Sequence, residues 1–205
     1  MKQPLISKEN PLILASASPR RREILQTLGV PFEVCPALSE QPIDPTLPIE
    51  EAVLKTAASK AREVAKKFPD RAVLGADTVV VLPAEEGGEV LGKPTSPAHA
   101  AEMLRRLSGR NHRVMTAVYL CTPQGNDGFT DTVHVAFYPM SERDIADYLD
   151  SGEPFDKAGA YGIQGLGSRY VRVIAGDFFT VMGLPAGRLW QFLAKFRADE
   201  DKERL

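Results

Sequence analysis

The segment from Leu12 to Leu28, LILASASPRRREILQTL, places the strongest constraint on the fold. It opens with an apolar run that is short enough for a buried strand. Ser18 followed by Pro19 is typical of a helix start, because serine caps the first turn and proline lacks an N–H that would be unpaired there. The sequence therefore predicts a strand that leads directly into a helix beginning at Pro19. The expected inner face of this helix consists of Ile24, Leu25 and Leu28.

The first turn of this helix carries three arginines, Arg20, Arg21 and Arg22, where most helices carry acidic residues. Positive charge at the positive end of a helix dipole is unfavourable by roughly a few tenths of a kcal/mol per residue. The turn is either a solvated basic surface or a binding site for a multiply charged anion such as a phosphate chain. The Ser-x-Ser-Pro sequence that precedes the arginines favours the anion site.

The composition limits the class of protein and its partners. A chain of 205 residues forms one domain or two small lobes with a substantial core, and 43% hydrophobic and 25% charged residues are typical of a soluble globular protein. A net charge of −2 gives no general attraction to nucleic acid or to an anionic membrane. The two cysteines, Cys35 and Cys121, are expected to be reduced thiols. No signal or membrane-spanning segment is apparent, so we expect a cytoplasmic protein.

A helix is predicted from about Ile49 to Phe68, and one of its residues is unusual. At 100° per residue, Lys60 falls about 20° from Val53, inside the apolar stripe of the helix. A lysine at such a position either extends its amine to solvent or meets an anion. The helical periodicity does not decide between the two.

The clearest strand is AVLGADTVVVL, from Ala72 to Leu82, which is apolar enough to be covered on both faces. Asp77 and Thr78 interrupt it. A buried carboxylate costs several kcal/mol unless it is paired, hydrogen-bonded, near a metal or at an opening. We therefore interpret Asp77 as a functional residue. Gly75 leaves room for a bulge or a close ligand.

Two further segments carry candidate groups. Lys93, between a glycine and a proline, is a candidate phosphate ligand, and Glu40 lies on a loop rich in proline and acidic residues. The glycine-rich segment from Gly152 to Ser168 is neither a Walker loop nor a dinucleotide fingerprint. It is either a linker or a region of close backbone approach, and Tyr161 and Gln164 are its residues with recognition chemistry.

The remaining pattern predicts both strands and helices. His112 to Cys121 and Phe129 to Tyr138 are expected to form a hairpin around Gly-Asn-Asp-Gly, with one face exposed and with His112 and His134 on the surface. A last hairpin is expected to join Tyr170–Ile174 to Phe178–Met182. Helices are predicted to begin after Ser96 and Ser141 and to run from Pro185 to Phe196. The charged tail, about 198–205, is expected to be frayed.

Together these unusual groups suit a triphosphate with a divalent metal. Arg20, Arg21, Lys60 and Lys93 supply positive charge for phosphate, and Asp77 and Glu40 can hold Mg²⁺ or activate a water molecule. The expected reaction is in-line hydrolysis of a phosphoanhydride, in which positioning and charge neutralisation supply most of the rate. The spacing does not identify the bond that breaks.

The motifs SASPRRREIL, GADTVV, LGKP and DKAGAYGIQGLG resemble those of the Maf nucleoside triphosphate pyrophosphatases over nearly the whole chain. The resemblance implies a single domain over residues 1–205 with an α/β, two-lobed fold similar to inosine-triphosphate pyrophosphatase, with a twisted mixed sheet and a central cleft. It also implies cleavage between the α and β phosphates to a nucleoside monophosphate and pyrophosphate, with Mg²⁺ or Mn²⁺ as cofactor.

The resemblance also implies roles for individual residues. Asp77 is the expected proton acceptor, and the phosphate and metal site is formed by Ser16, Arg21, Glu40, Lys60 and Lys93, with Asp77 and Glu40 as metal ligands. Arg20, Thr78 and Gln164 resemble the subgroup specific for dTTP and UTP. Uracil and thymine present two carbonyl acceptors on either side of an N3–H donor, and amide or hydroxyl side chains can pair with that edge.

Other functions remain open at this stage. They are a nucleotide-binding regulator of cell division and a purine pyrophosphatase acting on ITP or XTP. Nucleic acid is not expected as a partner, because aromatic residues are not interleaved with basic ones. A homodimer is compatible with the sequence, which does not determine the oligomeric state.

Overall fold

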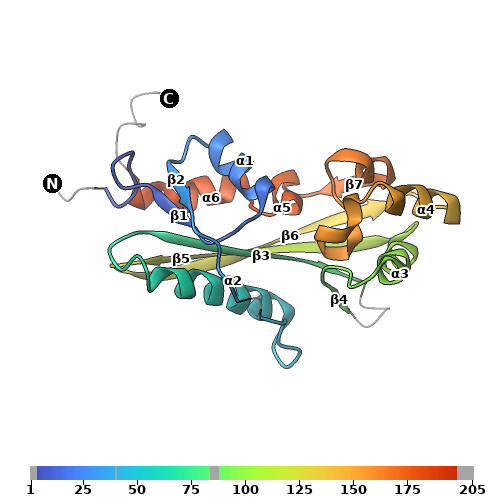
Figure 1. The fold of residues 1–205 in the computed structure, drawn as a ribbon, viewed down its shortest axis with the longest axis horizontal. Coiled ribbons are helices and arrows are strands. Elements are labelled where there is room, and N and C mark those ends of the chain that lie inside the picture. The colour runs from blue at the N-terminus through green and yellow to red at the C-terminus, as the bar shows by residue number, and fades with distance from the viewer. Residues whose placement is uncertain (1–3, 40, 84–87, 198–205) are drawn as a thin grey trace. The chain divides into compact units, whose positions relative to one another are not determined.

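The computed structural model describes residues 4–39, 41–83 and 88–197. Glu40 and the charged tail at 198–205 lie outside the described residues. The fold is α/β with a mixed sheet (Figure 1). The strands are β1 (Leu12–Leu14), β2 (Phe32–Val34), β3 (Val73–Val81), β4 (Val90–Leu91), β5 (Asn111–Thr122), β6 (Gly125–Phe137) and β7 (Val171–Ala175). The α-helices are α1 (Pro19–Thr27), α2 (Ile49–Ala65), α3 (Pro97–Leu107), α4 (Glu142–Asp150), α5 (Phe178–Met182) and α6 (Ala186–Leu193). Short 3₁₀ helices are η2 (Glu153–Asp156), η3 (Ala158–Ala160), η4 (Gly165–Tyr170) and η5 (Ala194–Phe196).

The sheet combines parallel and antiparallel pairs. Its strand order is β2-β1-β3-β5-β6-β7, and β4 pairs with β3. β1 is parallel to both β2 and β3, with Leu14 opposite Val34 and Leu74. β4 is antiparallel to β3, and β7 is antiparallel to β6. The predicted mixed sheet is therefore confirmed.

The chain divides into two compact units. The first is drawn from Met1–Asp77, Ala117–Thr130 and Gly183–Leu205, and the second from Thr78–Thr116 and Asp131–Met182. The chain passes from the first unit to the second between Asp77 and Thr78, within β3.

In the first unit, helix α2 packs directly against β3, and Figure 1 shows α6 on the other side of that strand. Gly75 makes the contact with α2 possible, because a Cβ there would lie 2.4 Å from the Ala57 carbonyl oxygen and 2.7 Å from the Ala61 nitrogen. The space at Gly75 is therefore filled by a helix and does not hold a ligand. Neighbouring apolar contacts come from Ile13, Val64 and Val73, which are fully buried.

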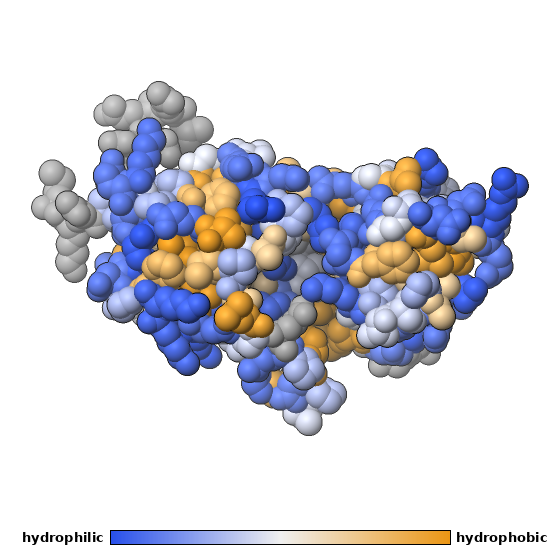
Figure 2. Space-filling model, in the orientation of Figure 1, coloured by the Kyte–Doolittle hydropathy of each residue, from blue (hydrophilic) through white to orange (hydrophobic). Residues whose placement is uncertain are grey.

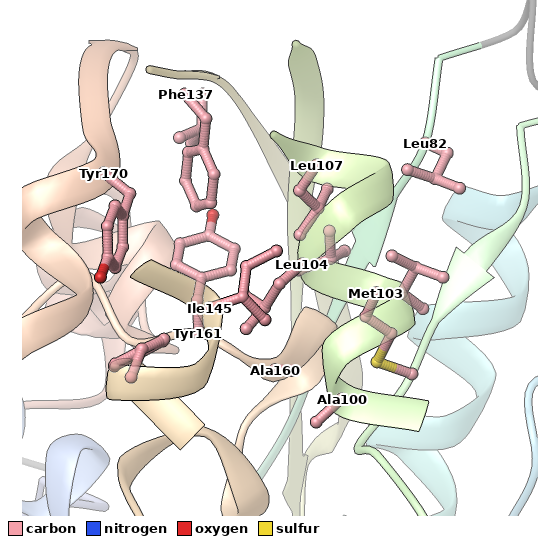
Figure 3. Close-up of a cluster of buried hydrophobic side chains, with 14 of the residues drawn as sticks. Leu82, Ala100, Met103, Leu104, Leu107, Phe137, Ile145, Ala160, Tyr161 and Tyr170 are labelled. Carbon is pink, nitrogen blue, oxygen red and sulfur yellow. The ribbon is translucent and has the colours of Figure 1, made fainter. Parts of the chain in front are cut away.

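The core of the second unit contains a large cluster of buried apolar side chains from α3, α4, the strands and the glycine-rich segment. Figure 3 shows Leu104 and Leu107 of α3 facing Ile145 of α4, with the rings of Phe137 and Tyr161 beside them. The two rings pack edge to face, with centroids 4.7 Å apart. The helix starts predicted after Ser96 and Ser141 are confirmed, since both serines cap the N-termini through their side chains.

Four expectations about local structure are wrong. The hairpin between β5 and β6 turns at Pro123 and Gln124, so Gly-Asn-Asp-Gly belongs to β6. β5 is largely buried instead of having one exposed face. Phe178–Met182 is helix α5, because the Asp177 carboxylate accepts the Phe179 N–H and caps a helical turn where a strand was expected. His112 is buried instead of lying on the surface.

The surface carries both hydrophobic and hydrophilic side chains. On the face shown in Figure 2, hydrophobic patches are separated by hydrophilic residues. Among the large apolar side chains of the described residues, Leu38 has the highest exposed fraction, 86%. Among the described residues, no helix has the length and hydropathy needed to cross a membrane.

His112 lies inside the core of the second unit at 2% exposure. Its Nε2 is 2.8 Å from the Tyr161 hydroxyl, and its ring packs edge to face on Phe137 with centroids 4.9 Å apart. The aromatic neighbours come from β6 and from the glycine-rich segment, which the period-two pattern of β5 does not reveal. Burial lowers the pKa of His112 to about 4.

This burial predicts a pH dependence of stability. The unfolded-state pKa of histidine is about 6.5. Because the folded pKa is lower, the contribution of neutral His112 is fully present above about pH 6.5 and is lost as the pH falls towards 4. The loss corresponds to roughly 3 kcal/mol of unfolding free energy. We expect His112→Phe to remove this part of the acid sensitivity in urea unfolding at about pH 7.5 and 4.5. An equal difference between wild type and variant at both pH values would contradict this prediction.

Candidate active site

The strand-to-helix junction of the first unit builds a polar cluster around Ser16. Ser16 follows β1 and is only 8% exposed. Arg21 Nη1 donates to Ser16 Oγ at 2.9 Å, and the Ser18 backbone N–H donates to the same oxygen at 3.3 Å. Arg21 Nε donates to the Gly183 carbonyl oxygen at 3.0 Å. Because Ser16 Oγ accepts both bonds, its O–H hydrogen remains as a donor for an anion.

The start of α1 agrees with the prediction in position but not in capping. Ser18 is the N-cap residue and Pro19 the first helical residue, yet the Ser18 side chain makes no cap hydrogen bond. The backbone of Ser18 turns toward Ser16 instead. A helix N-terminus without a serine cap keeps its first N–H groups as potential anion ligands.

Lys60 and Asp77 form an ion pair in the first unit. Lys60 Nζ of α2 donates to Asp77 Oδ1 of β3 at 2.6 Å, and the two side chains are only 14% and 15% exposed. Of the two interpretations of Lys60, the structure supports contact with an anion, and the anion is the Asp77 carboxylate. Close approach of α2 and β3 at Gly75 brings the two elements within reach.

The Ser16–Arg21 pair and the Lys60–Asp77 pair interact electrostatically through Arg21 and Asp77. Burial lowers the pKa of the Arg21 guanidinium, the negative charge of Asp77 raises it, and the positive charge of Arg20 lowers it. Arg21 is therefore placed between an acidic and a basic neighbour. Arg22 is exposed and is not part of this cluster.

The register of the parallel strands explains this assembly. The Ala15 N–H donates to the Leu74 carbonyl oxygen at 2.8 Å, so the carboxyl end of β1 lies beside the first part of β3, which continues to Val81. Ser16 follows the end of β1, and Asp77 lies three residues beyond Leu74 on β3. Ligands of parallel α/β sheets commonly bind beyond the carboxyl end of a strand, which is where Ser16 follows β1. The first unit thus brings together Ser16, Arg21, Lys60 and Asp77.

The oxygen donors of this cluster determine how it could bind a divalent metal. Asp77 is the carboxylate of this cluster among the described residues, and Glu40 lies outside them. Within residues 4–39, 41–83 and 88–197, no group of three or more His, Cys, Asp or Glu side chains could hold a metal. Mg²⁺ commonly uses one or two carboxylates together with substrate phosphates and water. The Asp77 carboxylate fits a metal that is bound jointly with a phosphate chain.

The second unit carries three of the predicted site residues. Thr78 is half-buried at the start of that unit, and Lys93 and Gln164 are exposed. The segment that carries Lys93 is tied to the glycine-rich segment, because the Gly159 N–H donates to the Gly92 carbonyl oxygen at 3.0 Å. These three residues are in a different unit from the first-unit cluster, which consists of Ser16, Arg21, Lys60 and Asp77.

The glycine-rich segment is a close-packed structure and not a linker. The Glu153 carboxylate accepts the Tyr148 hydroxyl at 2.9 Å and the Leu166 N–H at 2.8 Å. A Cβ at Gly167 would lie 2.2 Å from the Gly162 carbonyl oxygen, so the backbone approach requires glycine. These contacts fix the segment that carries Gln164.

Sequence reasoning missed a set of buried hydroxyl groups in the second unit. Thr116 and Thr180 are both 0% exposed, and Thr116 Oγ1 lies 3.0 Å from Thr78 Oγ1. A signal was present, because Thr116 interrupts the apolar run Val114–Val118 much as Asp77 and Thr78 interrupt theirs. Thr180 gave no such signal, because its segment was expected to be a strand.

Comparison with known proteins identifies the family. The family described as Maf-like protein matches residues 11–196. The dTTP/UTP pyrophosphatase of Bacillus velezensis is 47% identical over 185 residues, which cover 90% of this chain and 96% of the relative. The dTTP/UTP pyrophosphatase of Halalkalibacterium halodurans is 47% identical over 178 residues, covering 87% and 92%.

A solved structure supports the same fold. The Staphylococcus aureus Ham1 protein aligns with a TM-score of 0.50 and 15% identity, covering 90% of this chain and 98% of that one. At this identity the likeness concerns the fold alone. The sequence match extends from before β1 through α6 and includes all the motifs that supply the site residues. The chain belongs to the Maf-like protein family.

Proposed function

We propose that this chain is a nucleoside triphosphate pyrophosphatase that hydrolyses dTTP and UTP between the α and β phosphates. The products are the nucleoside monophosphate and pyrophosphate. Relatives at 47% identity that carry the name dTTP/UTP pyrophosphatase support this assignment. The observation that carries it is the partly buried Lys60–Asp77 pair beside the Ser16–Arg21 cluster. That arrangement combines a carboxylate base with several donors for phosphate oxygens.

Asp77 has the role of proton acceptor in this proposal. Its Oδ1 accepts the Lys60 amine, and the second carboxylate oxygen receives a proton from the attacking water. The water oxygen forms the new P–O bond while the bridging P–O bond between the α and β phosphates breaks. The single bridging oxygen departs with the leaving phosphate group, and the attacked phosphorus keeps the oxygen of the water.

The cationic and hydroxyl groups of the first unit bind the phosphate chain. Ser16 donates its O–H, and Arg21 presents a guanidinium held in place by Ser16 and Gly183. The Lys60 amine has three N–H donors, so it can contact a phosphate oxygen while it stays paired with Asp77. Negative charge that develops on the bridging and terminal oxygens is stabilised by these donors.

The remaining assignments rest on the family motifs. Lys93 binds phosphate, and Arg20 contributes to selection of the base. Thr78 and Gln164 form hydrogen bonds with the edge of the base. Asp77 and Glu40 would hold Mg²⁺ or Mn²⁺ with the triphosphate. When bound there, the metal would neutralise phosphate charge and polarise the P–O bonds.

A substrate panel tests this function. Purified protein with Mg²⁺ or Mn²⁺ is assayed for pyrophosphate release from dTTP, UTP, CTP, ATP, GTP, ITP and XTP. We expect kcat/KM for dTTP and UTP to exceed that for the other nucleotides by roughly 100-fold or more, because a wrong base leaves buried polar groups unpaired. Chelation by EDTA is expected to abolish turnover. Equal turnover of all seven, or preference for ITP and XTP, would contradict the specificity.

A further inference from the structure

A line of hydrogen bonds in the second unit runs from Thr78 into the interior. Thr78 Oγ1 is 3.0 Å from Thr116 Oγ1, and Thr116 Oγ1 is 2.7 Å from the Thr180 carbonyl oxygen. Thr180 Oγ1 in turn donates to Asp131 Oδ2 at 2.7 Å. Thr116 and Thr180 are fully buried, and Asp131 and Thr78 are half-buried.

The Thr180 carbonyl oxygen determines which hydroxyl is the donor in the hydrogen bond between Thr78 and Thr116. A carbonyl oxygen only accepts, so the single hydrogen of the Thr116 hydroxyl points to the Thr180 carbonyl. Thr116 then has no hydrogen left for Thr78, and the short contact between them requires the Thr78 hydroxyl to donate to Thr116. The only hydrogen of the Thr78 hydroxyl is thereby used inside the protein. Toward any other group, Thr78 Oγ1 acts only as an acceptor.

We propose that Thr116 is a positioning residue for base specificity, because it makes Thr78 an acceptor that selects an N–H donor on the base. Uracil and thymine carry such a donor at N3, whereas N3 of cytosine is itself an acceptor. Two acceptors facing each other exclude cytosine, since neither can supply the hydrogen of a bond. This proposal rests on the proposed function and on the role of Thr78 in it. It adds that the Thr78 hydroxyl acts as an acceptor toward the base, and that the buried residue Thr116 gives it this role.

The test compares UTP with CTP in full-length protein. Thr116→Val keeps the shape of the side chain but removes the acceptor, so the Thr78 hydrogen becomes available to cytosine N3. We expect the kcat/KM ratio of UTP to CTP to fall about tenfold or more, mainly through a lower KM for CTP. Thr116→Ser retains the hydroxyl and is expected to keep the wild-type ratio. A ratio measured on one preparation does not depend on the fraction of folded enzyme.

Thr180→Val is the matched control. It removes the bond to Asp131 but leaves the Thr180 carbonyl that orients Thr116. It is expected to keep the wild-type ratio even if its Tm falls. Should Thr116→Val fail to fold, Thr116→Cys supplies a weaker acceptor of similar size, and its ratio is expected to fall about threefold.

The outcomes separate this proposal from the function on which it rests. Wild-type protein that hydrolyses neither dTTP nor UTP would overturn the proposed function and this proposal with it. Wild-type hydrolysis of UTP together with an unchanged ratio in Thr116→Val, or in Thr116→Cys if only that variant folds, would overturn the role of Thr116 alone. The same conclusion would follow if Thr116→Ser lost the ratio as completely as Thr116→Val.

Discussion

Asp77→Asn is expected to lower hydrolysis of dTTP and UTP by about 10²- to 10⁴-fold, the usual contribution of a general base. Asparagine cannot accept the proton of the attacking water, but its amide oxygen can still accept the Lys60 N–H that now pairs with Asp77. The fold should therefore persist, with a lower Tm because the ammonium group of Lys60 loses its counter-charge. The measurement is steady-state pyrophosphate release, with circular dichroism to verify folding.

Asp44→Asn is the matched control for this variant. Asp44 also pairs with a lysine of α2, with its carboxylate 2.9 Å from Lys55 Nζ, but Lys55 is largely exposed. An exposed pair contributes little to stability and has no part in the proposed chemistry. We expect Asp44→Asn to keep activity within about twofold of wild type. Folded Asp77→Asn protein with near-wild-type turnover would show that Asp77 is not the base.

Gly75→Ala is expected to have the largest effect on stability. The added Cβ would lie 2.4 Å from the Ala57 carbonyl oxygen and 2.7 Å from the Ala61 nitrogen, and both are backbone atoms of α2 that cannot rotate away. Helix α2 must then move from β3, at a cost of about 3 kcal/mol in unfolding free energy. Because Lys60 lies next to Ala61 and Asp77 lies two residues after Gly75, we also expect the ion pair to lengthen and kcat to fall.

Gly187→Ala is the control for this prediction. Gly187 is in α6, and a Cβ there would meet nothing within 4 Å. Alanine in place of a helical glycine is expected to raise stability by about 0.5–1 kcal/mol. Urea unfolding of both variants provides the comparison. If Gly75→Ala were as stable as wild type, the close approach of α2 to β3 would not be the reason for glycine at this position.

Local signals in the sequence predicted the first-unit elements well. The apolar run at Leu12–Leu14 and the Ser18-Pro19 start gave β1 and α1 at their observed positions, because strands and helix starts depend on neighbouring residues. Lys60 and Asp77 were recognisable as polar groups in apolar patterns, but nothing in either segment showed that they contact each other. Their pairing depends on how α2 packs on β3, which is a tertiary property.

The wrong predictions also concern features that depend on contacts with other parts of the chain. His112 was expected on the surface because its strand alternates, yet Phe137 and Tyr161 from distant segments enclose it. Phe178–Met182 has a strand-like composition, but the cap at Asp177 makes it helical. Likewise, the acceptor role of the Thr78 hydroxyl could not be inferred from GADT. It depends on the Thr180 carbonyl oxygen, about a hundred residues along the chain, which accepts the hydrogen of Thr116. Glu40 stays a prediction from the motifs, since it lies outside the described residues.

Analysis of the products formed from dTTP is the most direct test of the proposed reaction. The reaction is followed by ³¹P NMR and anion-exchange chromatography, with the Asp77→Asn variant as the inactive reference. The proposed function predicts that dTMP and pyrophosphate appear in equal amounts, with neither dTDP nor inorganic phosphate as an initial product. Release of dTDP and phosphate would contradict cleavage between the α and β phosphates.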